Sequence, residues 1–210
     1  DNEGKTGFYL ACQHGHFQVV KLLTKESKSL DLDLNKADKD DGTPFHSACQ
    51  NKHYKIVNFL VNSMPKNDIT LKDNKGQRGL EVYLRKICEN GDVKALQKLL
   101  KFEANIDFNE PDEDGQTGLF LACKKGRFRI VKLLLDQSHA LGLRLNETDR
   151  GGMTPFHIAC LNQKSKVVQI IIESEEKCNI DLTLEDQNGF TGFGSLTKEC
   201  VHQDETVKKD

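Results

Sequence analysis

The chain has 210 residues, of which 37% are hydrophobic and 30% are charged, and its formal net charge is −2. This composition fits a soluble globular or repeat protein, and the near-neutral charge argues against a dedicated nucleic-acid binder, which usually carries a basic stripe. No apolar run approaches the ~18 residues that a membrane-spanning helix needs, so we expect no direct membrane insertion. The chain opens at Asp1 inside a structural pattern, with no initiator Met or visible signal peptide, and we expect it to be a piece of a longer protein.

The most informative feature is an internal repeat. An Asp opens each of six units, which start near residues 1, 38, 73, 112, 149 and 186. Five of these units have a Thr five residues after the Asp. Residues 1–23 and 112–134 share one sequence frame, so a block of about three units is duplicated. Self-similarity at a period of 35 to 39 residues predicts a stack of small supersecondary units.

Each unit is predicted to contain, in chain order, a hairpin tip, a helix, a turn, a second helix and a loop. Thr43 is placed as an N-cap with Pro44 at the first helical position, where its missing N–H costs nothing. Gly15 marks the turn that ends a first helix. Residues 19–23 then show the apolar spacing of a second helix. Helices this short are marginal alone in water, so each must pack against its neighbours.

The segments Thr-Pro-Phe-His-x-Ala at 43–48 and 154–159 resemble the Thr-Pro-Leu-His-x-Ala signature of the ankyrin repeat family. The resemblance extends over all six units. It implies an all-α fold, namely a single ankyrin-type α-solenoid of helix-turn-helix repeats with short β-hairpin fingers, over residues 1–210. Units one and four depart from the signature, because they carry Thr-Gly for Thr-Pro and place Tyr9 or Phe120 where the family has His.

Two units are irregular. Gly91 lies 18 residues after Asp73, whereas Gly15 lies 14 residues after Asp1. Four extra residues amount to about one helical turn, so the first helix of unit three is predicted to run from about Gly79 to about Glu89. The sixth unit starts normally but lacks an apolar second helix and ends in a polar run. It is interpreted as incomplete, either as a polar cap or, as we favour, as a chain cut within a repeat.

The cysteines indicate core positions rather than a disulfide framework. The chain has seven, and four of them directly follow an Ala at the same place in their units: Cys12, Cys49, Cys123 and Cys160. These thiols are predicted to be buried and reduced, which is typical of a reducing intracellular compartment, the cytoplasm or the nucleus.

Candidate chemistry is weak. Cys12, His14 and His16 alternate in a way that invites a metal site, but neighbouring positions on a helix point apart and no second ligand pair has zinc-site spacing. The family resemblance implies a structural role for His46 and His157, which would bond the backbone of the adjoining hairpin. No nucleophile elbow or phosphate-binding loop occurs. We therefore expect no catalysis, no cofactor and no metal.

The resemblance implies a protein-interaction scaffold that binds a protein partner on a concave face built from hairpin tips and first helices. The alternative is a regulatory or targeting ankyrin domain of a larger enzyme or membrane channel. The candidate contact residues are His14, Lys124, Lys125, Arg150, Met153, Leu161 and Phe190. Apolar and basic residues gather in units four to six, which suits a helix or extended segment with acidic residues. Packing between neighbouring fingers is the competing explanation for Met153 and Phe190.

Overall fold

The computed structural model describes residues 2–64, 71, 72, 74, 79–101 and 106–194. The chain divides into two compact units, Asp1–Lys86 with Leu100–Ile106, and Ile87–Leu99 with Asp107–Asp210. Whether the six repeats form one array, as the sequence predicts, stays a prediction.

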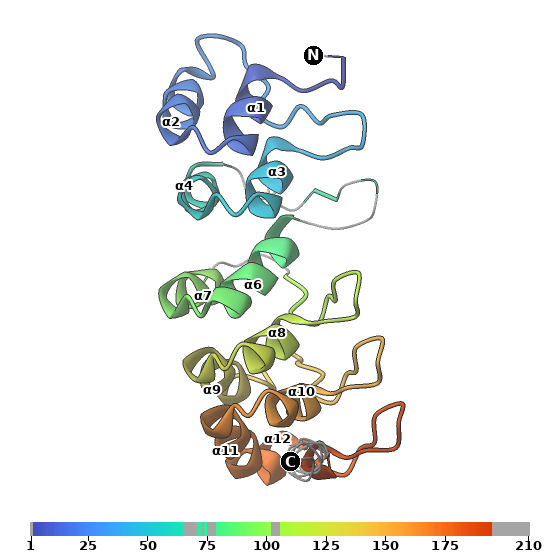
Figure 1. The fold of residues 1–210 in the computed structure, drawn as a ribbon. Coiled ribbons are helices and arrows are strands. Elements are labelled where there is room, and N and C mark those ends of the chain that lie inside the picture. Colours follow the sequence, from blue (N-terminus) through green and yellow to red (C-terminus); the bar gives the residue numbers. More distant parts are fainter. Residues whose placement is uncertain (1, 65–70, 73, 75–78, 102–105, 195–210) are drawn as a thin grey trace, which may run out of the picture. The chain divides into compact units, whose positions relative to one another are not determined.

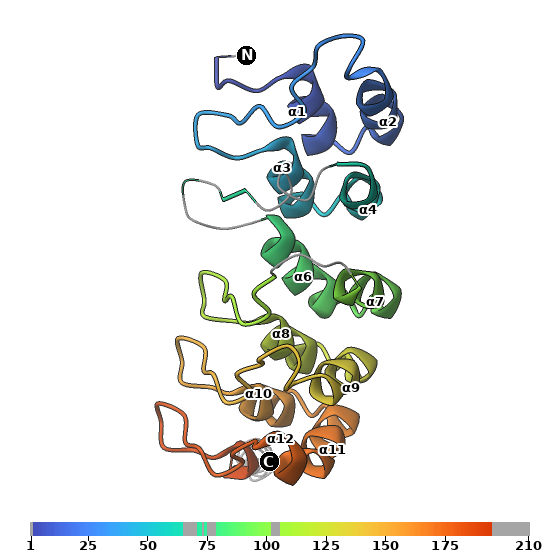
Figure 2. The ribbon, with the colours of Figure 1, turned by 180° about the vertical axis from the view of Figure 1, so that it is seen from behind.

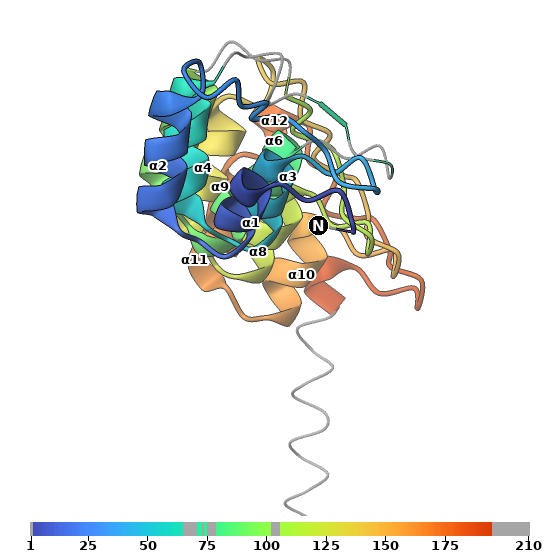
Figure 3. The same cartoon turned by 90° about the horizontal axis from the view of Figure 1, so that it is seen from above.

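The first compact unit contains helix pairs joined by short turns (Figure 1). Its helices are α1 (Gly7–Gln13), α2 (Phe17–Glu26), α3 (Pro44–Gln50) and α4 (Tyr54–Ser63), followed by the first part of α6 (Gly79–Asn90). Helix α1 packs against α3, and α2 packs against α4. Seen from above, α2 and α4 form an outer layer, α1 and α3 lie beside them, and the long loops lie on the far side (Figure 3).

The second compact unit repeats this arrangement (Figure 2). Its helices are α7 (Val93–Leu100), α8 (Gly118–Lys124), α9 (Phe128–Asp136), α10 (Pro155–Leu161), α11 (Ser165–Glu173) and α12 (Glu175–Cys178). Helix α8 packs against α10, and α9 packs against α11. The predicted alternation of first and second helices is therefore confirmed. None of the helices in the described residues is long and apolar enough to cross a membrane.

The predicted helix starts are confirmed. The Thr before each of four first helices has extended backbone, and its side chain accepts a hydrogen bond from the N–H three residues on; these are Thr6, Thr43, Thr117 and Thr154. Such a cap satisfies one of the N–H groups that a helix start leaves without an intrahelical partner. Pro44 and Pro155 occupy the first helical position, as expected.

The extra turn in unit three is also confirmed. Helix α6 has 12 residues, whereas α1, α3, α8 and α10 have seven each. Leu80, Leu84, Ile87 and Cys88 are all buried along it. This spacing places the four side chains on one face through the added turn, so the longer helix keeps a continuous apolar stripe.

The Ala-Cys positions lie in the core, as predicted. The thiols of the described residues are free and buried: Cys12, Cys49, Cys88, Cys123, Cys160 and Cys178. Burial raises the pKa of Cys12 and of Cys88 to about 12 and that of Cys160 to about 11. A thiol held neutral by apolar surroundings is a poor nucleophile and a poor metal ligand.

The loops before the first helices were expected to be β-hairpin fingers. The described residues contain no β-strand, and an isolated antiparallel bridge joins Glu185 and Thr191, so strand-built fingers are not confirmed. Four of the loops are closed instead by their opening Asp. In unit five the Asp149 N–H donates to the Met153 carbonyl at 3.0 Å, and Asp149 Oδ1 accepts the N–H groups of Gly151 and Met153 at 2.9 Å each. The same pattern occurs at Asp38, Asp112 and Asp186.

Candidate protein-binding surface

Three consecutive loops of the second compact unit, residues 112–116, 149–153 and 186–190, lie in a row. The Arg150 N–H donates to the Asp114 carbonyl at 3.0 Å, and the Gln187 N–H donates to the Gly151 carbonyl at 3.4 Å. These backbone links fix the loops to one another, so side chains on them are presented from a defined frame. This surface, together with the ends of α8 and α10, is called the loop surface below.

Two basic residues end helix α8. Lys124 is half-buried and donates to Gln116 Oε1 at 3.2 Å. Lys125 is exposed, and its Nζ lies 3.9 Å from Glu89 Oε1. An ion pair at that separation with one exposed partner contributes little to stability, so the Lys125 ammonium is available to a partner at small cost.

Arg150 and Leu161, like Lys125, are exposed candidate residues of this unit. Arg150 is exposed, and its carbonyl accepts a hydrogen bond from Gln187 Nε2 at 2.6 Å, so its backbone is held while its side chain faces water. Leu161 ends helix α10 and is exposed. Exposed Arg and exposed aliphatic residues are both typical of interfaces.

Met153 and Phe190 are half-buried. Their N–H groups bond to the opening Asp of their own loops, Met153 to Asp149 at 2.9 Å and Phe190 to Asp186 at 3.0 Å. Both residues therefore contribute to the loop frame, and packing between loops competes with partner binding as an explanation for their side chains.

His14 belongs to the first compact unit. It is exposed at the end of helix α1, with its ring centroid 6.1 Å from that of His16. Nothing places it with the candidates of the second unit, and its part in binding stays a prediction.

The His of the Thr-Pro-Phe-His motif has the structural role that the resemblance implies. His157 Nε2 lies 2.8 Å from the Phe190 carbonyl, an acceptor, so this nitrogen carries the proton. Its Nδ1 then accepts from the Thr154 N–H at 3.3 Å and lies 2.7 Å from Thr154 Oγ1. With both ring nitrogens engaged in the scaffold, His157 is not placed to act as a general base.

Tyr9 takes over this role in the first unit. It stands at the position of the His, and its hydroxyl donates to Asp38 Oδ2 at 2.8 Å. Burial, with a further contribution from the hydrogen bond to Asp38, raises the pKa of Tyr9 above its usual value. Unit one, which has Thr-Gly in place of Thr-Pro, thus bonds the loop of unit two through a phenol instead of an imidazole.

The turns between helices carry no candidate metal site. Among the described residues no three His, Cys, Asp or Glu side chains gather closely enough to hold a metal ion. His53 Nε2 donates to the Gln13 carbonyl at 2.9 Å and so satisfies a group that the end of helix α1 leaves open.

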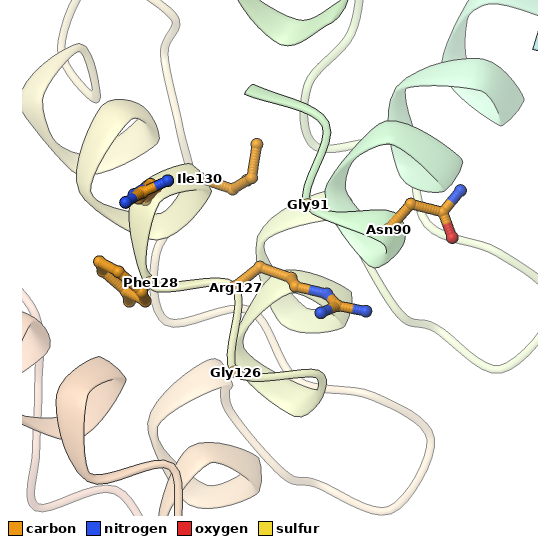
Figure 4. A pocket seen from close by; sticks show the side chains of 7 residues that line it. Asn90, Gly91, Gly126, Arg127, Phe128 and Ile130 are labelled. Atoms are coloured by element: carbon orange, nitrogen blue, oxygen red, sulfur yellow. The ribbon is translucent and has the colours of Figure 1, made fainter. Parts of the chain in front are cut away.

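A small pocket of about 160 Å³ lies at the equivalent turn of the second unit, between residues 90–91 and 126–130. The Arg127 side chain extends from it toward the end of α6 (Figure 4), where Nε donates to the Glu89 carbonyl at 2.9 Å. Pockets for small ligands usually measure roughly 300–1,000 Å³, so this one does not suit an organic cofactor. Arg127 performs the same task as His53.

One apolar pair was not predicted as functional. Val168 and Ile172 of α11 are partly exposed, although the equivalent residues of α9 are buried. Unit six lacks the apolar stripe of a second helix. This was the sequence signal that could have revealed an exposed face on the second helix of unit five, α11.

Residues 1–73 and 84–186 match the family model described as ankyrin repeats, three copies. The chain therefore belongs to the ankyrin repeat family. It is also 43% identical over 47 residues to the acyl-CoA-binding domain-containing protein 6 homolog of Dictyostelium discoideum. That match covers 22% of this chain and 16% of the relative, so the chain spans only a small part of that protein.

Proposed function

We propose that this chain is a non-catalytic scaffold that binds a protein partner on the loop surface of its second unit, which corresponds to the concave face of ankyrin repeats. Ankyrin repeats are generally protein-interaction modules. The observation that supports this proposal most is the exposure of Arg150 on a loop whose backbone is held by Asp149, together with the exposure of Leu161 at the end of α10.

The charges of the loop surface indicate the chemistry of the partner. The loop surface carries the positive charges of Lys124, Lys125 and Arg150 and the exposed apolar side chain of Leu161. A segment with acidic residues next to apolar ones would complement both features. The loop of unit four also exposes Asp114, so a basic residue at one end of the partner segment would be accommodated.

Affinity capture from cell extract with matched variants tests this proposal. The surface variant combines Arg150→Glu with Leu161→Ser. The control variant combines Lys132→Glu with Leu22→Ser, which are exposed positions on second helices. The wild type and the control should capture the same proteins, and the surface variant should lose them while keeping the wild-type circular dichroism. Equal capture by all three would contradict the proposal.

A second proposal is that the chain serves as a regulatory or targeting ankyrin domain within a larger enzyme or channel. The relative named for an acyl-CoA-binding domain favours it, because the matched segment makes up 16% of that protein. An antibody against this chain should then detect a species well above 23.7 kDa in cells. A single species of about that mass would argue for the stand-alone scaffold.

The compartment is likewise a proposal. Buried free thiols without disulfides in the described residues support the cytoplasm or the nucleus. Immunofluorescence with the same antibody tests it, and a secretory location would contradict it.

A further inference from the structure

Helices α9 and α11 occupy equivalent places in successive repeats, 37 residues apart, so Val131 corresponds to Val168 and Leu135 to Ile172. In α9, against which α11 packs, Val131 is 0% and Leu135 is 2% exposed. In α11, Ile172 is 41% exposed and Val168 is partly exposed. Helix α11 thus carries the stacking face of a second helix, and no described residue covers it as α11 covers α9.

This face forms a groove of about 670 Å³. Its lining is Gln163, Ser165, Val168, Gln169, Ile172 and Glu173. Two aliphatic side chains lie among polar ones, and Gln169 Nε2 donates to Glu173 Oε1 at 2.8 Å. On the opposite side Val167 and Ile171 are buried, so the helix that carries the groove is anchored in the core.

The repeat itself shows what kind of element covers such a face. Helix α2 is the first second helix of the described chain, and its Val19 and Leu22 are 45% and 58% exposed. The residues equivalent to Val19 in α9 and α11, Ile130 and Val167, are buried. In a second helix, the position equivalent to Val19 and the position three residues later, equivalent to Leu22, therefore face the preceding repeat. A covering helix needs aliphatic residues at this spacing.

The chain's last residues provide that stripe only in part, because the positions equivalent to Val167 and Ile170 are Asp204 and Val207. By the 37-residue register, residues 204 and 208 correspond to Val167 and Ile171, and they are Asp204 and Lys208. Charged residues at the two positions that anchor α11 in the core disfavour an equivalent helix.

A second copy of the chain also fits poorly. Gly192 lies against the Phe156 ring, and the rings of Phe156 and Phe193 meet edge to face at 5.0 Å between centroids. The start of unit six therefore already occupies the first-helix place beside α10. A second copy would bring its α1 together with its α2, and the two first helices would collide.

We propose that the α11 groove docks a single amphipathic helix from a partner protein, in the place of the second helix of unit six. The partner helix carries aliphatic residues at i and i+3 and a Lys or Arg near its C-terminal end. The basic residue follows from the preceding repeat, where Lys177 of the short helix α12, which follows α11 after Ser174, has its Nζ 4.0 Å from Asp136, the equivalent of Glu173. This helix-in-groove site is separate from the loop surface and does not depend on it.

The probe is a fluorescein-labelled peptide with the sequence of residues 164–177, which carries the stripe that α11 itself presents to α9. It contains Gln169→Lys joined to Glu173 by a lactam, which favours the helix, and its binding to the full chain is followed by anisotropy. We expect saturable binding that Ile172→Asp weakens at least tenfold. Leu32→Asp, at a position of similar exposure in the first unit (36% against 41%), should bind like the wild type. Thermal melts should show that both variants fold.

Four results would overturn the inference. They are absence of peptide binding, equal binding by Ile172→Asp, and binding that appears only after removal of residues 195–210, which would make that segment the occupant. The fourth is concentration-dependent association of the wild type in light scattering that Ile172→Asp abolishes, which would make the groove a self-interface. Ile172→Leu keeps the apolar surface and should keep the affinity.

Discussion

At the scale of single residues, the Asp that opens four of the repeats is explained by loop closure. A short carboxylate reaches the N–H groups two and four residues on, which a longer Glu side chain would not do from the same backbone position. This accounts for the recurrence of Asp at 38, 112, 149 and 186 better than a general preference for polar residues in exposed loops does.

Asp149→Ala removes the oxygen that accepts both hydrogen bonds of the loop. We expect the free energy of unfolding to fall by about 2 kcal/mol, at roughly 1 kcal/mol for each hydrogen bond. Asp149→Asn keeps an oxygen in place and should cost less than half of that. Chemical denaturation followed by circular dichroism measures both values, and equal losses in the two variants would show that the negative charge matters more than the hydrogen bonds.

The buried thiols predict how stability depends on pH. Burial raises the pKa of Cys88 in the folded chain to about 12, from an unperturbed value of 9.0. The folded state therefore keeps a proton that the unfolded state releases above pH 9. The stabilisation is complete below pH 9 and is lost as the pH rises toward 12, by about 1 kcal/mol per thiol between pH 9 and 10.

Denaturation at pH 8, 9 and 10 checks this prediction. The variant Cys88→Ala should be less stable than the wild type at pH 8 but should lose less on going to pH 10. An identical pH dependence in the two proteins would mean that the Cys88 thiol ionises without unfolding. Thiol reagents should also react slowly at neutral pH until the chain opens.

At the scale of elements, the turn between the two helices of a repeat is fitted to the next repeat. A Cβ on Gly15, which has φ of 75°, would lie 2.7 Å from the His53 ring. A Cβ on Gly126 would lie 2.9 Å from the Lys164 side chain. Glycine is thus required twice, for its left-handed backbone and for the side chain of the following repeat.

Gly15→Ala and Gly142→Ala separate these two requirements. Gly142 has φ of 57°, but no atom lies within 4 Å of the place that an added methyl group would take, so its substitution should cost only the backbone term of about 1–2 kcal/mol. Gly15→Ala should cost clearly more, because the methyl group displaces His53 from the Gln13 carbonyl. Adding His53→Ala to each variant tests the coupling, which should be large with Gly15→Ala and absent with Gly142→Ala.

Local signals explain what the sequence could predict at this scale. The caps at Thr43 and Thr154 and the added turn of α6 depend on residues close in the chain, so the pattern shows them directly. The form of the loops was not accessible in the same way, since Asp149 closes its loop by side-chain acceptance rather than by a strand ladder. The exposure of Met153 could not be read from its position either, because half-burial depends on the neighbouring loop.

At the scale of the whole molecule, the described helices of each compact unit meet as neighbours in repeat order. Helix α2 packs on α4 and α9 packs on α11, and the loops are joined from one repeat to the next. A repeat therefore has two kinds of free surface: the loop surface along the row, and the stacking face where a neighbour is lacking, as on α11. The family match defines this architecture, whereas the side chains on these surfaces determine the partner.

Neighbour-only packing predicts that damage stays local. Ile56 in α4 and Ile130 in α9 are fully buried, at 1% and 0% exposure, and truncation of either to Ala should cost about 2–5 kcal/mol. In a stack whose stability is a sum of repeat and nearest-neighbour terms, Ile56→Ala should speed hydrogen exchange most in α2, α3 and α4. Ile130→Ala should do so most in α8, α9 and α11, with the first unit changing less. Exchange followed by mass spectrometry on peptides from each helix makes the comparison, and a uniform rise across the chain in both variants would show that all repeats open in one cooperative step.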